Sequence, residues 1–165
     1  MKISIIYFSE TGNTKKAAEF IKAGAESVEN TEVRMFNLKD DNLDKEYIEE
    51  SKAVIFGTPT YCANMCWQMK KFLDLDWTTK LSGKIGSVFA TENSANGGGA
   101  ELAIMSIINH ILVKGMLVYS SGAEYGRPYI HIGPALVKDL IDEREDFCNL
   151  FGKRVAGKAH EIFDK

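Results

Sequence analysis

The stretch that decides the fold is residues 3–14, Ile-Ser-Ile-Ile-Tyr-Phe-Ser-Glu-Thr-Gly-Asn-Thr. It begins with an apolar run that is typical of a buried strand, and this run ends abruptly at Ser9. A polar loop follows, and residues 15–28 have the composition of a helix. A strand, a tight polar loop and a helix N-terminus in succession predict an anion site, because backbone N–H groups and the positive end of the helix point at one spot.

The polar loop contains no Lys or Arg, so fixed dipoles and hydroxyl donors would hold a phosphate here. It matches neither the G-x-x-x-x-G-K-[ST] loop of nucleoside triphosphatases nor the G-x-G-x-x-G loop of dinucleotide-binding folds. The pattern Ser9-x-Thr11-Gly12-x-Thr14 after a first strand resembles the phosphate loop of the flavodoxin-like family, which holds the monophosphate of FMN. A Ser/Thr-capped helix after a buried strand is the alternative that this loop alone leaves open.

Length and composition predict one soluble domain over residues 1–165, since hydrophobic content of 45% is ordinary for a globular chain of this size. The net charge of −3 and the lack of a basic face argue against a nucleic-acid partner. The chain starts directly with a strand, and no apolar run reaches the roughly 18 residues of a membrane span, so neither a signal peptide nor a membrane partner is expected. Three cysteines without framework spacing favour a cytoplasmic location.

Strand and helix patterns alternate along the chain. Strands are predicted over residues 2–8, 33–38, 53–57, 85–90 and 116–119, and helices over 13–29, 45–51, 65–75, 99–114 and from Pro134 to about Phe163. Strands interleaved with helices predict an α/β fold with a parallel sheet covered on both faces. The connection over 120–133 is the longest irregular one, and such loops are often functional.

Three loops leave the carboxyl ends of neighbouring strands, where doubly wound sheets bind their ligands. The first loop is residues 9–14. The second and third read Thr58-Pro59-Thr60-Tyr61-Cys62-Ala63-Asn64 and Thr91-Glu92-Asn93-Ser94-Ala95-Asn96-Gly97-Gly98-Gly99. All three are rich in turn residues and backbone donors, so we expect one site where they converge.

The segment Phe56-Gly57-Thr58-Pro59-Thr60-Tyr61, followed by Asn64-Met65 and Gln68-Met69, resembles the second flavin loop of WrbA-type NAD(P)H:quinone oxidoreductases. These enzymes belong to the flavodoxin-like group. The match continues through Phe72-Leu73-Asp74, Gly83-Lys84 and Ser87-Val88-Phe89 to the glycines at 97–99. The resemblance implies a flavodoxin-like doubly wound five-stranded parallel sheet in the order 2-1-3-4-5 with helices on both faces, and FMN rather than FAD as cofactor.

The resemblance also implies roles for individual residues. Phosphate binding falls on Ser9, Glu10, Thr11, Gly12, Asn13 and Thr14. Contacts to the flavin ring fall on Pro59, Thr60, Tyr61, Cys62, Ala63 and Asn64, and on Thr91, Glu92, Asn93, Ser94, Ala95 and Gly97. Candidate substrate residues are Trp77, Tyr125 and His131. No side chain has the pattern of a catalytic acid or base, and no metal is expected.

Two departures from the WrbA-type pattern bear on function. The segment between the second and third strands is shorter than in those enzymes, where it helps the subunits assemble. Its shortness argues against a tetramer, and the oligomeric state stays open between a homodimer and a homotetramer. Lys114 stands where those enzymes carry a histidine, so a contact to the ring edge is lost or replaced. Cys62 and Cys66 are four residues apart, which would allow a redox pair, but two thiols are too few to hold an iron–sulfur cluster. The sequence favours buried, inert thiols over a redox pair.

Two functions remain. The sequence favours an enzyme that takes hydride from NAD(P)H and passes it to a quinone or similar flat acceptor, because residues 91–99 contain no aromatic side chain to cover a second flavin face. Hydride transfer between stacked rings needs proximity rather than an acid or base. The alternative is a flavodoxin-type electron carrier without nicotinamide-dependent activity of its own, whose partner would be a redox protein.

Overall fold

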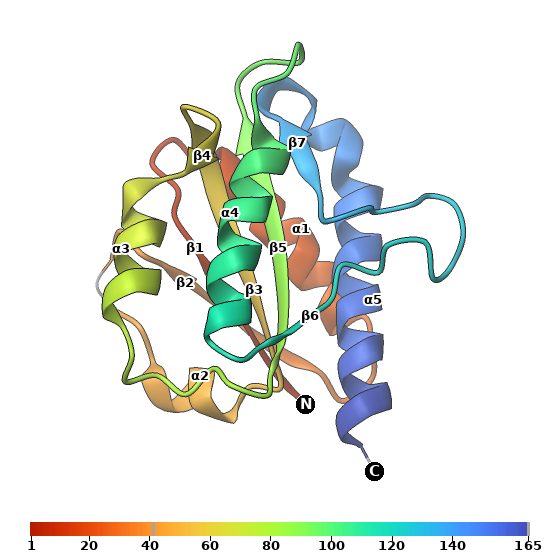
Figure 1. Ribbon diagram of the computed structural model, residues 1–165. Helices are drawn as coiled ribbons and strands as arrows, with labels where there is room; N and C mark the ends of the chain where they lie inside the picture. The colour runs from red at the N-terminus through yellow and green to blue at the C-terminus, as the bar shows by residue number, and fades with distance from the viewer. Residues whose placement is uncertain (41, 165) are drawn as a thin grey trace.

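The computed structural model describes residues 1–40 and 42–164, so positions 41 and 165 of the predicted domain lie outside the described residues. A parallel sheet lies between two layers of helices (Figure 1). The main strands are β1 (Lys2–Tyr7), β2 (Glu32–Asn37), β3 (Ala53–Tyr61), β5 (Ile85–Glu92) and β6 (Leu117–Val118), in the spatial order β2-β1-β3-β5-β6. This order confirms the predicted fold class and the arrangement 2-1-3-4-5.

The helices cover both faces of the sheet. One face carries α1 (Asn13–Glu26) and α5 (Glu145–Phe163), and the other carries α2 (Lys45–Glu50), α3 (Trp67–Leu75) and α4 (Ala100–Val113). Successive strand residues alternate between the two cores: Ile55 packs with α1 and α5, whereas Val54 and Phe56 pack with α3 and α4. Burial on both faces explains why these strands read as continuous apolar runs.

Helices α1 and α5 approach each other closely at two glycines. A Cβ atom built on Gly152 would lie 1.9 Å from the carbonyl oxygen of Ile21, and one on Gly24 would lie 1.9 Å from that of Asn149. Atoms of a real side chain do not approach a backbone oxygen to this distance, so only glycine permits the contact. The tight packing of these helices therefore depends on two residues without side chains.

The last strand of the sheet is split, which corrects the prediction for the end of the chain. β6 pairs with the start of β5, Leu117 opposite Ile85, whereas β7 (Ala135–Val137) pairs with its end, Ala135 opposite Ala90. The helix predicted from Pro134 begins instead at Glu145, after the 3₁₀ turns η1 (Lys138–Leu140) and η2 (Asp142–Arg144). Pro134 precedes a strand because its carbonyl accepts the Ala90 amide at 2.9 Å, and proline is tolerated at such positions.

Two other boundaries move. β3 and β5 extend to Tyr61 and Glu92, so part of each predicted loop is strand. The helix predicted over 65–75 begins at Trp67, because β4 (Asn64–Met65) turns back to pair antiparallel with the end of β3. The second loop is thus a short hairpin that rises from the sheet.

The segment between β6 and β7 projects beside α5 (Figure 1). An antiparallel bridge joins Gly122 to His131 near its base. Arg154 of α5 donates to Ser121 Oγ at 3.2 Å and to the Pro128 carbonyl at 3.1 Å. These contacts attach the segment to α5. Within the described residues, each helix is too short or too polar to traverse a bilayer.

Candidate functional site

The three predicted loops line one cavity of about 370 Å³ at the carboxyl ends of β1, β3 and β5. This volume lies in the range of small-molecule sites in proteins. The lining residues come from all three loops and from η1: Ser9, Glu10, Thr11, Asn13 and Thr14; Pro59, Thr60 and Tyr61; Thr91, Glu92 and Asn93; and Lys138. The predicted convergence therefore holds in the structure.

The first loop is held open by side chains of its own and of β2. Ser9 Oγ accepts the amides of Gly12 and Lys15, each at 3.2 Å. Asn37 Oδ1 accepts the Ser9 amide at 3.2 Å, and Asn37 Nδ2 donates to the Ser9 carbonyl at 3.3 Å. The sequence interpretation missed Asn37. The sequence could have indicated Asn37 only as a polar residue at the end of β2, which reaches the same edge of the sheet as β1.

Backbone donors of the first loop are left free for a ligand. In the described part of the chain, the amides of Thr11, Asn13 and Thr14 donate to no acceptor. These groups surround the N-terminus of α1, where the helix dipole favours an anion. Gly12 permits this geometry because its φ of 99° lies in the left-handed region, which a residue with a Cβ rarely adopts.

The acidic residues that line the cavity are paired with other groups. Lys39 Nζ donates to Glu10 Oε1 at 3.0 Å, and Glu92 Oε2 accepts the Ala100 amide at 2.9 Å at the start of α4. Lys138 is the cationic side chain among the described lining residues. It was missed because it follows β7, which the sequence interpretation placed in a helix. The cavity is therefore suited to a negatively charged ligand.

The second loop is a two-residue hairpin turn. Tyr61 pairs with Asn64, and the central residues Cys62 and Ala63 have φ of 51° and 56°, as a type I′ turn requires. The third loop packs directly on it, because a Cβ on Gly99 would lie 2.6 Å from the Ala63 side chain. Cys62 is exposed, so the expectation of a buried thiol is wrong there.

The other predicted thiol, Cys66, is buried, and burial raises the pKa of this thiol. Its amide donates to Thr58 Oγ1 at 3.0 Å, which ties the hairpin to the end of β3. An inert, structural role therefore fits Cys66.

The polar and aromatic groups of the cavity test whether it fits FMN. Thr60 Oγ1 is buried and lacks a hydrogen-bond partner among the described residues, and an unsatisfied buried hydroxyl of this kind calls for a ligand or water. Thr14 and Thr91 share a hydrogen bond of 2.8 Å between their hydroxyls, which joins the first loop to the third. Tyr61, with 49% of its surface exposed, offers an aromatic ring at the same cavity. The free amides suit the phosphate of FMN, and the aromatic ring and the unpaired hydroxyl suit its flavin ring.

The remaining loop residues of the prediction do not line the cavity. Gly12, Cys62, Ala63, Asn64, Ser94, Ala95 and Gly97 belong to the three loops but lie outside its lining. They shape the turns instead of contributing to the wall. Their predicted contacts to FMN stay a prediction.

Trp77 lies at the opposite edge of the sheet from the cavity, so this placement does not support its predicted contact with a substrate beside the flavin. α3 returns from the carboxyl edge to the amino edge, and Trp77 follows its end. Lys114 Nζ lies 4.0 Å from the centroid of the Trp77 ring and donates to the Asp76 carbonyl at 2.9 Å. Lys114 therefore contacts Trp77 and does not line the cavity. It does not replace the ring-edge contact that the histidine makes at this position in WrbA-type enzymes.

Tyr125 and His131 also lie away from the cavity. The Arg154 guanidinium lies 5.2 Å from the centroid of the Tyr125 ring. His131 lines a separate hollow with Glu101 and Arg144. Their predicted contact with a substrate of the flavin site is not supported by this placement, because the segment that carries them packs on α5.

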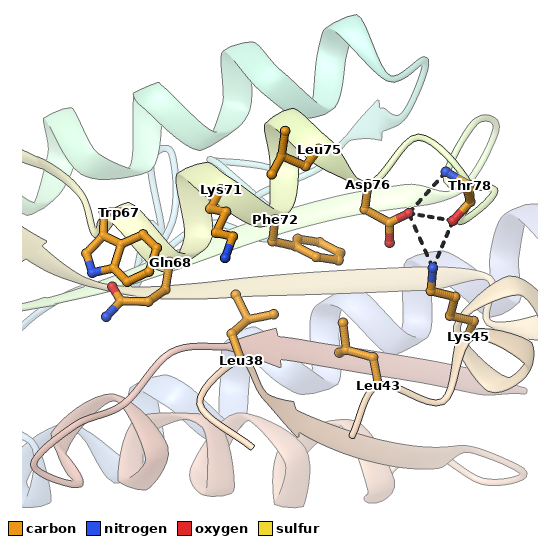
Figure 2. A pocket seen from close by; sticks show the side chains of 10 residues that line it. All are labelled: Leu38, Leu43, Lys45, Trp67, Gln68, Lys71, Phe72, Leu75, Asp76 and Thr78. Atoms are coloured by element: carbon orange, nitrogen blue, oxygen red, sulfur yellow. Dashed lines mark hydrogen bonds and ion pairs between the residues drawn. The ribbon is translucent and has the colours of Figure 1, made fainter. Parts of the chain in front are cut away.

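A second hollow, of about 530 Å³, lies between α3 and the chain around Leu38 and Leu43 (Figure 2). At one end, Lys45 Nζ donates to Thr78 Oγ1 at 2.8 Å and lies 3.7 Å from Asp76 Oδ1. Burial raises the pKa of the Asp76 carboxyl, but hydrogen bonds from Thr79 and Thr78 outweigh it and lower the pKa to about 2. The polar groups at this end satisfy one another, whereas elsewhere in the lining the buried Gln68 Oε1 has no hydrogen-bond partner among the described residues.

Comparison with known proteins agrees with the geometry. The family model described as Flavodoxin matches residues 5–159. A flavodoxin of Clostridium saccharobutylicum is 44% identical over 99% of this chain and 100% of its own length. An NAD(P)H dehydrogenase (quinone) of Aromatoleum aromaticum is 36% identical over 72% of this chain and 69% of its own. The structure of an archaeal flavodoxin is similar with a TM-score of 0.76 and 26% identity, covering 96% of this chain and 99% of the other.

Proposed function

The chain belongs to the flavodoxin family, and from this premise we propose that it is an FMN-dependent carrier of electrons between redox proteins. The observation that carries the proposal is the full-length similarity to the clostridial flavodoxin, which exceeds that to the quinone dehydrogenases in both identity and coverage. We therefore prefer the carrier to the nicotinamide-dependent enzyme that the sequence alone favoured.

Bound FMN supplies the redox chemistry, and the chain supplies binding and access. The amides of Thr11, Asn13 and Thr14 would hold the phosphate without a mobile cation. The ring of Tyr61 and the hydroxyl of Thr60 would contact the flavin from the second loop. The hydrogen bond between the Thr14 and Thr91 hydroxyls joins the first loop to the third on the two sides of the cavity.

Access to the cavity also supports a carrier. Tyr61 and the third-loop residues 93–97 are exposed, so a protein surface can approach the cavity from outside. The residues expected to bind a small substrate, Trp77, Tyr125 and His131, lie elsewhere. An exposed rim without these substrate residues suits transfer of electrons to a docked protein.

A quinone reductase is the second candidate. It is favoured by the third loop, which has no aromatic residue over positions 91–99, and by the relatives named NAD(P)H dehydrogenase (quinone). An open flavin face would let a flat acceptor stack there. The two candidates differ in their response to NADH and NADPH.

Anaerobic redox titration of the FMN-loaded protein separates them. For a carrier we expect no reduction by NADH or NADPH over minutes, and potentiometry should resolve two one-electron steps. Saturable, NAD(P)H-dependent reduction of benzoquinone with ping-pong kinetics would instead establish the enzyme. In that case, replacing Ser94 with Trp should suppress turnover while FMN stays bound, because the new ring would cover the open face.

Replacing Tyr61 with Ala is expected to weaken FMN binding by about 1–3 kcal/mol, since aromatic burial and stacking are lost together. The dissociation constant of the apoprotein, measured by quenching of FMN fluorescence, checks this. Tyr129→Ala is the matched control, because Tyr129 is similarly exposed but lies outside the cavity. Equal affinities of the Tyr61 variant and wild type would place the ring away from the flavin.

A further inference from the structure

The α3 hollow, which lies between α3 and the chain around Leu38 and Leu43, has the composition of a small-molecule site (Figure 2). Its volume of about 530 Å³ lies in the range of such sites, which are mostly apolar with a few polar groups at fixed places. Leu38, Leu43 and Phe72 pack against the buried core and form an apolar wall. The indole of Trp67, with 64% of its surface exposed, lies at one end. A flat, largely apolar ligand would cover these side chains.

The unmet hydrogen-bonding capacity of this lining lies at the Trp67 end. Gln68 Oε1 is buried and accepts no hydrogen bond from a described residue, and such a group costs free energy unless a ligand or water donates to it. Figure 2 shows the Gln68 amide beside the Trp67 ring. At the other end, by contrast, Lys45, Asp76 and Thr78 bond to one another. The hollow therefore calls for a hydrogen-bond donor at Gln68.

Lys71 adds a positive charge to the same end of the hollow. Its Nζ lies 5.6 Å from the centroid of the Trp67 ring, and within the described residues it forms no ion pair, since the nearby Asp74 pairs with Lys70. Side chains three residues apart on a helix start about 5–6 Å from each other, so Gln68 and Lys71 can contact one end of a single ligand. The complementary end carries a hydrogen-bond donor with a carboxylate close to it.

We propose that the α3 hollow binds a heteroaromatic acid, whose ring N–H donates to Gln68 Oε1 and whose carboxylate pairs with Lys71. The ring stacks on Trp67. A ring N–H suits the buried acceptor better than a hydroxyl does, because it donates without bringing lone pairs that would themselves need donors. The carboxylate stays at the open side of the hollow, where Lys71 is exposed to water. The hollow and the flavin cavity have separate linings, so this proposal does not depend on the function assigned to the cavity.

Isothermal titration calorimetry of the FMN-loaded protein with three probes tests the site. The probes are indole-3-acetate, 1-methylindole-3-acetate, which lacks the N–H, and indole-3-acetamide, which lacks the charge. We expect indole-3-acetate to bind at one site per chain. The methylated acid should bind at least about fivefold more weakly, because it leaves the buried oxygen unsatisfied. The amide should bind about two- to fivefold more weakly, the usual loss for one exposed ion pair.

Gln68→Met keeps the length of the side chain and removes the acceptor. This variant should bind indole-3-acetate at least about fivefold more weakly than wild type, and it should bind 1-methylindole-3-acetate no more weakly, because the methylated probe never donates to Gln68. Its denaturant midpoint should equal or exceed that of wild type, because an unsatisfied buried oxygen has been removed. A loss of affinity together with retained stability separates a ligand-binding role from a structural one.

Lys71→Met should lower the affinity for both acids and leave that for indole-3-acetamide unchanged. Lys70→Met is the matched control, because it removes the same charge from the adjacent position on α3, which lies outside the lining, and it should bind all three probes as wild type does. Absence of indole-3-acetate binding at millimolar concentration, or an affinity that Gln68→Met leaves unchanged, would overturn the proposal. Binding that shifts the flavin absorbance and persists in Gln68→Met would also overturn it, because it places the indole on the flavin.

Discussion

Replacing Gly12 with Val is expected to lower the affinity of the apoprotein for FMN at least about 100-fold, or about 2.7 kcal/mol. Gly12 has φ of 99°, which a β-branched residue adopts only under strain, so the loop must change its backbone conformation. That change would misdirect the neighbouring amides of Thr11 and Asn13, whose charge-assisted hydrogen bonds to a phosphate are among the stronger ones in proteins. Fluorescence titration with FMN measures the loss, and titration with riboflavin, which lacks the phosphate, should show a much smaller one.

Gly83→Val is the matched control for this substitution. Gly83 also has a positive φ, 79°, and also has open space around its would-be Cβ atom, but it precedes β5 at the opposite edge of the sheet. The control variant therefore carries the same kind of backbone strain without touching the cavity, and it should bind FMN as wild type does. If both variants lose FMN equally, the effect of Gly12 is one of stability and the phosphate loop is misassigned.

Replacing Gly152 with Ala is expected to lower the free energy of unfolding by about 3 kcal/mol, the upper range for overpacking a close contact. The new Cβ would lie 1.9 Å from the Ile21 carbonyl oxygen and 2.9 Å from the Ala25 amide nitrogen, so α1 and α5 must separate. Denaturant unfolding at one fixed excess of FMN measures the change, because bound ligand itself adds stability.

Gly157 provides the comparison on the same helix. A Cβ atom at this position meets nothing within 4 Å, so Gly157→Ala should stabilise the protein by about 0.5–1 kcal/mol through helix propensity alone. Opposite signs for the two substitutions would show that the contact, and not the helix, determines the cost. Two stabilised variants would mean that α1 and α5 are not in close contact at Gly152.

The fold and most of the cavity were predictable from local sequence. Each loop of the site follows its own strand directly, so residues 9–14, 59–61 and 91–93 were found by reading along the chain. Asn37 and Lys138 were missed because they act on loops that lie distant in sequence. Asn37 supports Ser9 from the neighbouring strand, and Lys138 enters the lining only after β7 returns to the sheet.

The errors have a common physical origin in contacts between segments that are far apart in the chain. The segment 134–137 is short and begins with proline, so its local pattern does not distinguish a strand from the start of a helix. Its pairing with β5 makes it a strand. Trp77 was placed by the resemblance to WrbA-type enzymes, but α3 carries the chain about 14 Å along the helix axis, at 1.5 Å per residue, toward the other edge of the sheet.

By itself, the sequence determined the alternation of strands and helices, the parallel sheet and the polar loop at the N-terminus of α1, because burial of both sheet faces and the chemistry of a helix N-terminus depend on consecutive residues. Only the tertiary structure decided which side chains complete the cavity, where α1 and α5 require glycine, and which residues line the α3 hollow. Those features depend on the distance between elements, and that distance is set by the packing of side chains that no single segment contains.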